Sequence, residues 1–286
     1  MTFTKVYLLP LSFVAILFIT FATTFTISVR LKHVTPIFPY ISDTGTKPPE
    51  STIFGQMLNV SSVIIFVCLH LRYLQVNEIL RDPNLPHHQE ISRLNRICYS
   101  LSFFVSLGLS IVANFQETVL FPIHIAGACL LFTGAITYNC IQVKMCFKLI
   151  PRFCSLKLAK IRLFLSVLQV LTGVSTGVFM MKSLMVFNKP IQQIPLWTPE
   201  DEGYQYHVAS TISEWILVTA NAVSVGTNYE ECKTVILIPP KNVKSERTAS
   251  RNSTLVILSR LLGGLGPTRN SCVRKAHFSI YRKSQK

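Results

Sequence analysis

Residues 7–29 read YLLPLSFVAILFITFATTFTISV, a run without a single charged side chain. A helix needs about 20 apolar residues to cross the ~30 Å hydrocarbon core of a bilayer, and this run is long enough. Similar runs follow at 53–71, 97–113, 121–143, 163–187 and 208–227. Only Lys182 and Glu214 bring a charge into any of them. The sequence therefore predicts an all-α polytopic membrane protein with six transmembrane helices.

The composition supports this prediction. Hydrophobic residues make up 49% of the chain and charged residues 14%, against about 25% charged residues in soluble domains. Strands of a membrane barrel would alternate polar and apolar residues, which these runs do not do. The first run has an alternative interpretation as a cleaved signal peptide. It is longer than the roughly 7–15 residues of a typical signal core, which favours a retained span.

Lysine and arginine are distributed unevenly among the connections between the runs. Cytoplasmic connections of membrane proteins carry an excess of both residues. The second and fourth connections and the chain after the sixth run are rich in them, whereas 114–120 has none. This alternation predicts that both termini are cytosolic. The net charge of +15 then reflects orientation and contact with anionic lipid head groups, and no nucleic-acid-binding motif accompanies it.

The chain divides into two unequal parts. Residues 1–232 are predicted to form one membrane domain, and residues 233–286 a basic cytosolic tail whose composition favours disorder. No CxxC pair, metal-ligand spacing or cofactor-binding motif occurs in the sequence. We therefore expect neither a metal nor a cofactor, and no nucleic-acid partner.

The predicted cytosolic side carries two kinds of candidate modification or sorting signal. Tyr73 and Val76 frame a Tyr-x-x-apolar tetrapeptide of the type that sorting adaptors read. Cys146, Cys154 and Cys232 lie beside predicted span ends and are candidate palmitoylation sites. An interfacial tyrosine and unmodified thiols are the alternative interpretations.

Two predicted lumenal connections cluster turn-forming and aromatic residues. In the first, prolines and an Asp-Thr-Gly step favour an ordered turn with an Asx cap; its residues are Pro39, Tyr40, Ile41, Ser42, Asp43, Thr44, Gly45 and Thr46. It is either a recognition surface or a lid over the helix bundle. The second contains Trp197, Pro199, Glu200, Asp201, Gly203 and Tyr204. Thr198 before Pro199 predicts a helix start there, and the three acids are either cation ligands or simply solvated.

Glu214 lies well inside the sixth run, where an ionisable side chain is costly and normally faces a partner or a water-filled cavity. Ser210, Asn221 and Ser224 fall on the same helical face. Two interpretations fit this polar stripe: an interhelical hydrogen-bond clamp, which we favour, and a proton or ion pathway.

Three segments of the chain resemble one known family. They are residues 39–46 with the nearby Pro49, Glu50, Phe54 and Gly55, residues 107–116, and the stretch from Trp197 to Trp215. Together they are similar to the DRAM family, the DNA-damage-regulated autophagy modulators, and the resemblance stops before the tail. It implies a six-span protein of lysosomal and related endomembranes that promotes autophagy, linked in some members to stress-induced cell death. Related branches influence phosphoinositide signalling or mechanically evoked currents at the plasma membrane, or take part in GPI-anchor lipid remodelling.

We therefore expect a non-enzymatic regulator of autophagy in lysosomal or late-endosomal membranes, with the plasma membrane and other endomembranes as alternative locations. The expected partners are membrane lipids and membrane or cytosolic autophagy proteins. Other functions stay open. A lipid-remodelling enzyme would need Asp43, His207 and Glu214 at one depth, and a channel or transporter subunit would need a continuous polar pore, lined by the polar stripe of the sixth run. An accessory subunit in phosphoinositide signalling is a further alternative.

Overall fold

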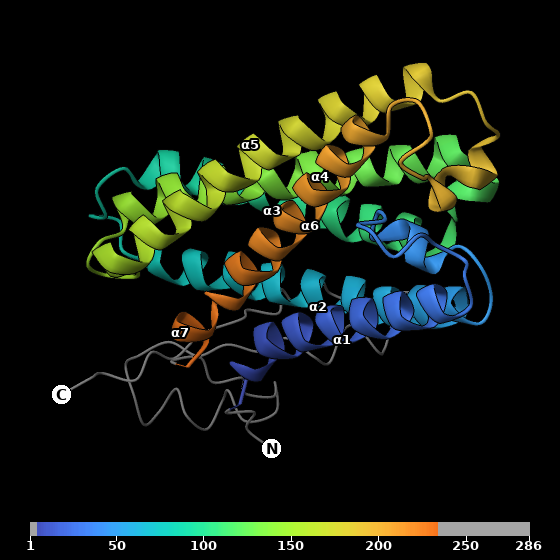
Figure 1. Cartoon of the computed structure of the whole chain (residues 1–286). Helices are drawn as coiled ribbons and strands as arrows, with labels where there is room; N and C mark the ends of the chain where they lie inside the picture. Colours follow the sequence, from blue (N-terminus) through green and yellow to red (C-terminus); the bar gives the residue numbers. More distant parts are fainter. Residues whose placement is uncertain (1–4, 234–286) are drawn as a thin grey trace, which may run out of the picture.

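The computed structural model describes residues 5–233, and its regular elements there are all helices. The long ones are α1 (Leu8–Arg30), α2 (Glu50–Ile79), α3 (His88–Asn114), α4 (Glu117–Lys148), α5 (Leu156–Val186) and α6 (Tyr204–Gly226), as Figure 1 shows. Two 3-10 helices, η1 (Ser42–Gly45) and η2 (Ile191–Leu196), lie in connections, and the short α7 (Tyr229–Cys232) follows α6. The predicted tail lies outside the described residues, apart from Lys233.

Six helices are long and apolar enough to cross a membrane, which confirms the predicted fold class. Each predicted apolar run lies within one helix or extends one residue past its end. The helices are generally longer than the runs because polar flanking residues are also good helix formers. Thus α2 continues to Ile79, and α3 begins already at His88.

Helices that follow one another along the chain pack side by side: α1 with α2, α2 with α3, α3 with α4, and α5 with α6 (Figure 1). Helix α6 also contacts α1, and Thr24 of α1 hydrogen-bonds to Thr44 of η1 over 2.9 Å, so α1 is an integral part of the bundle. Helices α3 and α4 approach closely at Gly108, where a Cβ atom would lie 2.6 Å from the backbone nitrogen of Leu131. Glycine is required there for this close packing.

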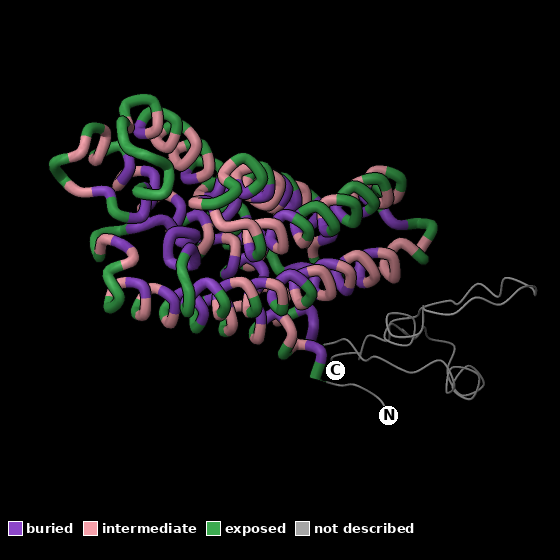
Figure 2. The backbone as a smooth tube through the Cα atoms, turned by 90° about the vertical axis from the view of Figure 1, so that its right-hand side faces the viewer, coloured by how far each residue is buried: buried purple, intermediate pink, exposed green. Residues whose placement is uncertain are grey.

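Large apolar side chains cover the outside of the bundle. Phe164, Val174 and Met185 of α5 are 67%, 63% and 76% exposed. Figure 2 shows buried residues along the inward sides of the helices and exposed residues on the outer sides. Exposing apolar area to water costs about 25 cal/mol per Å². Surrounding hydrocarbon removes that cost, so this surface fits a bilayer.

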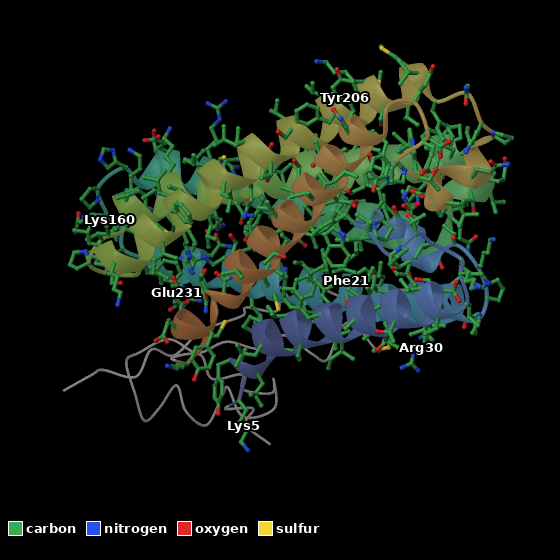
Figure 3. All side chains as sticks on the ribbon, in the orientation of Figure 1. Lys5, Phe21, Arg30, Lys160, Tyr206 and Glu231 are labelled. Atoms are coloured by element: carbon green, nitrogen blue, oxygen red, sulfur yellow. The ribbon has the colours of Figure 1, made fainter. Side chains whose placement is uncertain are left out.

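A buried ionic cluster joins α2, α5 and α7 at one end of the bundle. Arg162 donates to both carboxylate oxygens of Glu231 at 2.7 and 2.8 Å, and Arg72 lies 3.0 Å from the same carboxylate. All three side chains are more than nine-tenths buried. Breaking such a pair by removing one partner typically costs about 3–5 kcal/mol. In Figure 3, Glu231 and Lys160 lie toward this end and Arg30 and Tyr206 toward the other.

The lysine and arginine distribution predicts that the Glu231 end faces the cytosol. Cysteines introduced as Lys47→Cys and Glu202→Cys, at exposed positions in connections of the opposite end, should react with a membrane-impermeant maleimide only from the lumenal or extracellular side. Asn84→Cys, also exposed, should react only from the cytosol. Labelling before and after selective permeabilisation measures this. Reaction of positions 202 and 84 from the same side would contradict the six-span topology.

Candidate functional site

Two connections, 31–49 and 187–203, lie at the end of the bundle opposite Glu231, and we call them the cap (Figure 1). Its first segment is fixed through the backbone. The amide of Tyr40 donates to Asp43 Oδ2 at 2.8 Å, and the amide of Ile41 donates to Glu214 Oε2 of α6 at 2.9 Å. The indole Nε1 of Trp215 donates to the carbonyl oxygen of Pro39 at 2.9 Å. This segment is therefore tied directly to α6.

Every residue from 39 to 46 is buried, so the segment offers little surface to a partner and acts as a lid. Gly45 makes the close fit feasible, because a Cβ atom there would lie 2.4 Å from the ring of Phe54 on α2. The expected Asx-capped turn is wrong in detail. Residues 42–45 form a 3-10 turn, and the Asp43 carboxylate accepts from the amide of Tyr40, three residues before it.

An aromatic cluster joins the two cap segments. Trp197 stacks on His207 of α6 with ring centroids 4.4 Å apart. Its ring also contacts the ring of Phe187, with centroids 4.1 Å apart. Tyr40 meets the other side of the cluster, edge-on to His207 at 5.1 Å. Trp197 and His207 are each 1% exposed. The family-like tryptophan thus serves as a packing centre for the cap.

The predicted helix start at Thr198–Pro199 is wrong. Residues 198–202 form turns in which Asp201 Oδ2 accepts from the amide of Thr198 at 2.9 Å, and α6 begins only at Tyr204. Gly203, in the left-handed region at φ +78°, separates the turns from the helix. Lys189 pairs with Asp201 and lowers the pKa of that carboxyl.

Glu200 and Glu202 are exposed. No group of three His, Cys, Asp or Glu side chains that could hold a metal ion occurs within residues 5–233. The cation interpretation of the three acids therefore gains no geometric support from the part of the chain described.

Three acidic side chains from different elements meet beneath the cap. Ser42 donates to Glu117 Oε2 of α4 at 2.8 Å, Asp43 lies against Glu117, and Glu214 reaches over from α6. Burial raises the pKa of Asp43 well above its usual range, and the neighbouring Glu117 adds to the shift. Within residues 5–233 no other group hydrogen-bonds to Asp43 Oδ1 or Glu117 Oε1, and the hydrogen bond between these two carboxyl groups requires one proton between them.

His124 stands at the edge of this acid group. Its Nδ1 donates to the carbonyl oxygen of Phe115 at 2.7 Å, which leaves Nε2 facing Glu117 Oε2 at 3.8 Å. Sequence reasoning singled out Asp43, His207 and Glu214 but missed Glu117 and His124. Little in the sequence signals them, because Glu117 falls in the predicted connection 114–120 and α4 departs from helical geometry at Leu120, between the two residues.

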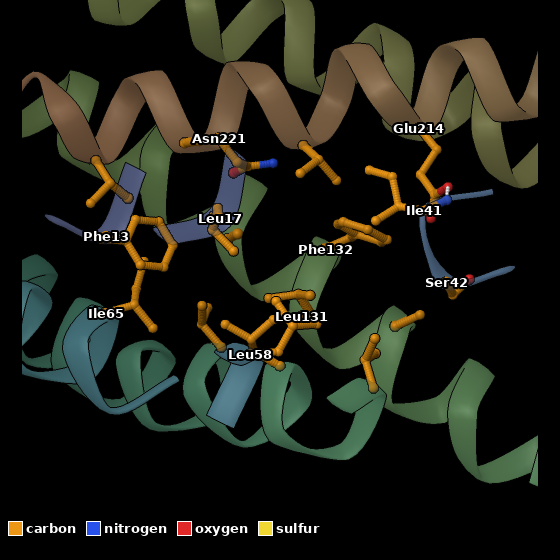
Figure 4. Close-up of a pocket in the computed structure, with 18 of the residues that line it drawn as sticks. Phe13, Leu17, Ile41, Ser42, Leu58, Ile65, Leu131, Phe132, Glu214 and Asn221 are labelled. Atoms are coloured by element: carbon orange, nitrogen blue, oxygen red, sulfur yellow. Dashed lines mark hydrogen bonds between the residues drawn. The ribbon is translucent and has the colours of Figure 1, made fainter. Parts of the chain in front are cut away.

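Two apolar cavities meet at the acid group. The inner cavity has a volume of about 100 Å³ and lies among α1, α2, α3, α4 and α6. Figure 4 shows Glu214 and Asn221 at its α6 side, opposite Leu58 and Leu131. A larger lateral groove of about 360 Å³ lies between α4 and α5. Both are lined by Ser42, His124, Ala128, Phe132 and Glu214.

The polar stripe of α6 is divided between two tasks. Glu214 binds the cap backbone rather than polar groups of neighbouring helices, which corrects the partner we expected. Farther along, Asn221 Oδ1 accepts from Asn139 of α4 at 3.1 Å, and Ser224 Oγ accepts from Gln169 of α5 at 2.8 Å. These hydrogen bonds join α6 to α4 and to α5 inside the bundle, as an interhelical clamp requires. We therefore continue to favour the clamp over an ion pathway.

Most of the candidate sorting and palmitoylation residues are buried in this structure, and Tyr73 is half-buried. Val76 is fully buried within α2, and Tyr73 stacks on Tyr99 with ring centroids 4.5 Å apart. The candidate thiols of Cys146, Cys154 and Cys232 are likewise buried. Cys146 accepts from Arg162 Nη1 at 3.1 Å inside the ionic cluster. An adaptor or acyltransferase would need these side chains at the surface, so the geometry argues against both interpretations.

The fold and the site define a six-helix membrane protein whose family-like loop is folded into the bundle as a buried cap. A family model described as the Frag1/DRAM/Sfk1/Cwh43P N-terminal domain matches residues 5–235. The chain belongs to this family, which confirms the resemblance noted in the sequence.

Several curated proteins are similar to the chain. Rat DNA damage-regulated autophagy modulator protein 2 is 37% identical over 211 residues, covering 72% of this chain and 76% of the relative. Human DNA damage-regulated autophagy modulator protein 1 is 32% identical over 214 residues, covering 73% and 85%. Xenopus laevis modulator of macroautophagy TMEM150B-B is 34% identical over 143 residues, covering 50% and 58%. No solved structure matches the chain.

Glu214 is expected to stabilise the cap. Glu214→Leu removes the acceptor for the buried Ile41 amide, and leaving such a donor unsatisfied costs about 1–3 kcal/mol. Glu214→Gln keeps an acceptor oxygen and should be close to the wild type in stability. Thermal unfolding of the purified variants and their steady-state abundance in cells measure the difference. Equal stability of the Leu and Gln variants would show that this bond contributes nothing.

The cap should also be more stable at acidic pH. Because the pKa of Asp43 is raised from 3.8 in the folded state, the folded protein binds the extra proton, and this contribution to stability is lost as pH rises through the folded pKa. Asp43→Asn mimics the protonated acid next to Glu117. The melting temperature of the wild type should therefore fall more than that of the Asn variant between pH 5 and pH 8. Parallel pH dependences would rule out this role for Asp43.

Proposed function

We propose that the protein is a non-enzymatic modulator of autophagy in lysosomal and late-endosomal membranes. The observation that carries the proposal is the family match, which spans both cap segments and all six long helices. Relatives matched over most of their length are named as autophagy modulators rather than as enzymes. Their names also mention DNA damage, and we include a link to stress-induced cell death in the proposal. Membrane lipids and autophagy proteins are the proposed partners.

The geometry of the cap supports a structural role for the family-like residues. Asp43, Glu214 and Trp197 are all used to hold the cap in place, and His207 is covered by the rings of Trp197 and Tyr40.

A lipid-modifying enzyme is a second candidate, favoured by one observation. The Ser42 hydroxyl is hydrogen-bonded to the Glu117 carboxylate, with His124 close by, where two apolar cavities meet. Ser42→Ala separates the two functions. An enzyme that uses the hydroxyl as a nucleophile loses its function with the cap intact. A modulator loses one hydrogen bond, worth about 1 kcal/mol, and keeps its function.

Deleting the gene should lower autophagic flux, measured as turnover of an autophagosome marker with and without lysosomal inhibition. Re-expression of the wild type should restore the flux, whereas Gly45→Ala should not, because its Cβ atom would clash with Phe54 and prevent the cap from docking. Gly226→Ala is the matched control, since the nearest atom to a Cβ atom there, on Val14, would lie 3.4 Å away, an ordinary contact. Unchanged flux after deletion would overturn the proposal. Full rescue by the Gly45 variant would show that docking of the cap is not needed for the proposed function.

A further inference from the structure

The lateral groove is open to the surroundings of the bundle. Its rim includes Cys129 and Thr133 of α4 and Val170 and Val174 of α5, all of which are exposed. In a bilayer these positions face hydrocarbon, as the apolar outer surface of α5 shows. A membrane-dissolved molecule can therefore enter sideways, between the two helices, without passing through water.

The groove has the size and wall of a binding site for one hydrocarbon chain. Its volume of about 360 Å³ lies in the range of small-molecule sites, about 300–1,000 Å³. Along α5 it is bordered by Gly173 and Gly177. The Gly-x-x-x-Gly spacing normally brings helices into contact. Here a Cβ atom on Gly177 would meet nothing within 4 Å, so the glycine leaves space instead of closing the helix pair.

The inner end of the groove is acidic. Glu117 and Glu214 line it, and both side chains are more than nine-tenths buried. Glu214 uses one oxygen to bind the Ile41 amide, and its other oxygen accepts no hydrogen bond from residues 5–233. Within the same residues no lysine or arginine pairs with Asp43, Glu117 or Glu214, and the one basic side chain within 4 Å of any of them is His124, beside Glu117. Buried carboxylates normally have a cation or several donors as partners.

We propose that the lateral groove binds a single-chain lipid with a primary amine head group. Its hydrocarbon chain lies between α4 and α5, and its ammonium group donates to the free oxygen of Glu214 and to Glu117. An ammonium group has three donors and no acceptor, which complements the carboxylate oxygens at this end. A fatty acid or a phospholipid would bring an anion against the two glutamates, and like charges repel there. This inference does not depend on the role in autophagy.

Photolabelling of the full-length protein tests the proposal. The protein, reconstituted in phosphatidylcholine nanodiscs, is treated with a sixteen-carbon alkylamine that carries a diazirine near the end of its chain. Mass spectrometry should find saturable labels on the groove-lining parts of α4 and α5. Unlabelled alkylamine should compete, and the alcohol and carboxylic acid of equal chain length should compete at least about tenfold less well, as loss of a charged hydrogen bond predicts. Equal competition by all three would overturn the amine assignment.

Three variants locate the site. Gly177→Phe should fill the groove and abolish saturable labelling, whereas Val178→Phe, the same new side chain at an exposed position outside the groove, should leave it unchanged. Glu214→Gln keeps the acceptor for Ile41 but removes the charge, so the alkylamine should compete about tenfold less well or worse. If the Gly177 variant unfolds, Glu214→Gln still tests whether the amine binds in the groove. Undiminished labelling of Glu214→Gln, or of a folded Gly177→Phe variant, would refute the proposal.

Discussion

The hydrogen bond from the Ile41 amide to the Glu214 carboxylate is the interaction on which the rest of the cap depends. A connection that folds into an apolar bundle leaves water behind, and each unsatisfied backbone group then costs free energy. The protein meets this constraint with side chains: carboxylates accept from the backbone amides, and an indole donates to a carbonyl oxygen. Glu214 binds Ile41, Asp43 binds Tyr40, and Trp215 satisfies the carbonyl of Pro39. With its backbone satisfied in this way, the segment can place Ser42 and Asp43 against α4.

The two ends of the bundle handle buried charge differently. At the Glu231 end, two arginines surround one carboxylate, and the charges are paired directly. Beneath the cap, carboxyl groups meet without an arginine or lysine in residues 5–233, and a shared proton takes that role between Asp43 and Glu117. Direct pairs persist over a wide pH range, whereas a shared proton is released as pH rises. The cap end is therefore the end whose stability responds to pH.

The sequence was sufficient for the helices and insufficient for the cap. Apolar runs locate the six spans because hydrocarbon requires them, whatever the tertiary contacts. Residues 39–46 contain serine, aspartate and threonines, which in isolation indicate an exposed turn, and only the contact with Glu214 and Glu117 accounts for their burial. Nor did the sequence show that Cys146 and Val76 are buried. Position near a span end does not reveal whether a side chain faces inward.

The open space between α4 and α5 is bordered by the cap itself, through Tyr40, Ser42 and Ile194, and by Glu214, which binds the cap. An unfilled groove forfeits the van der Waals contact that closed helix pairs gain, yet Gly177 leaves this space open. Glu214 holds the Ile41 amide with one oxygen and faces the groove with its carboxyl group. An amine bound in the groove, as proposed, would share this carboxyl with the Ile41 amide. Thermodynamic linkage requires that whatever such binding does to docking of the cap, docking does to affinity in the groove by the same factor.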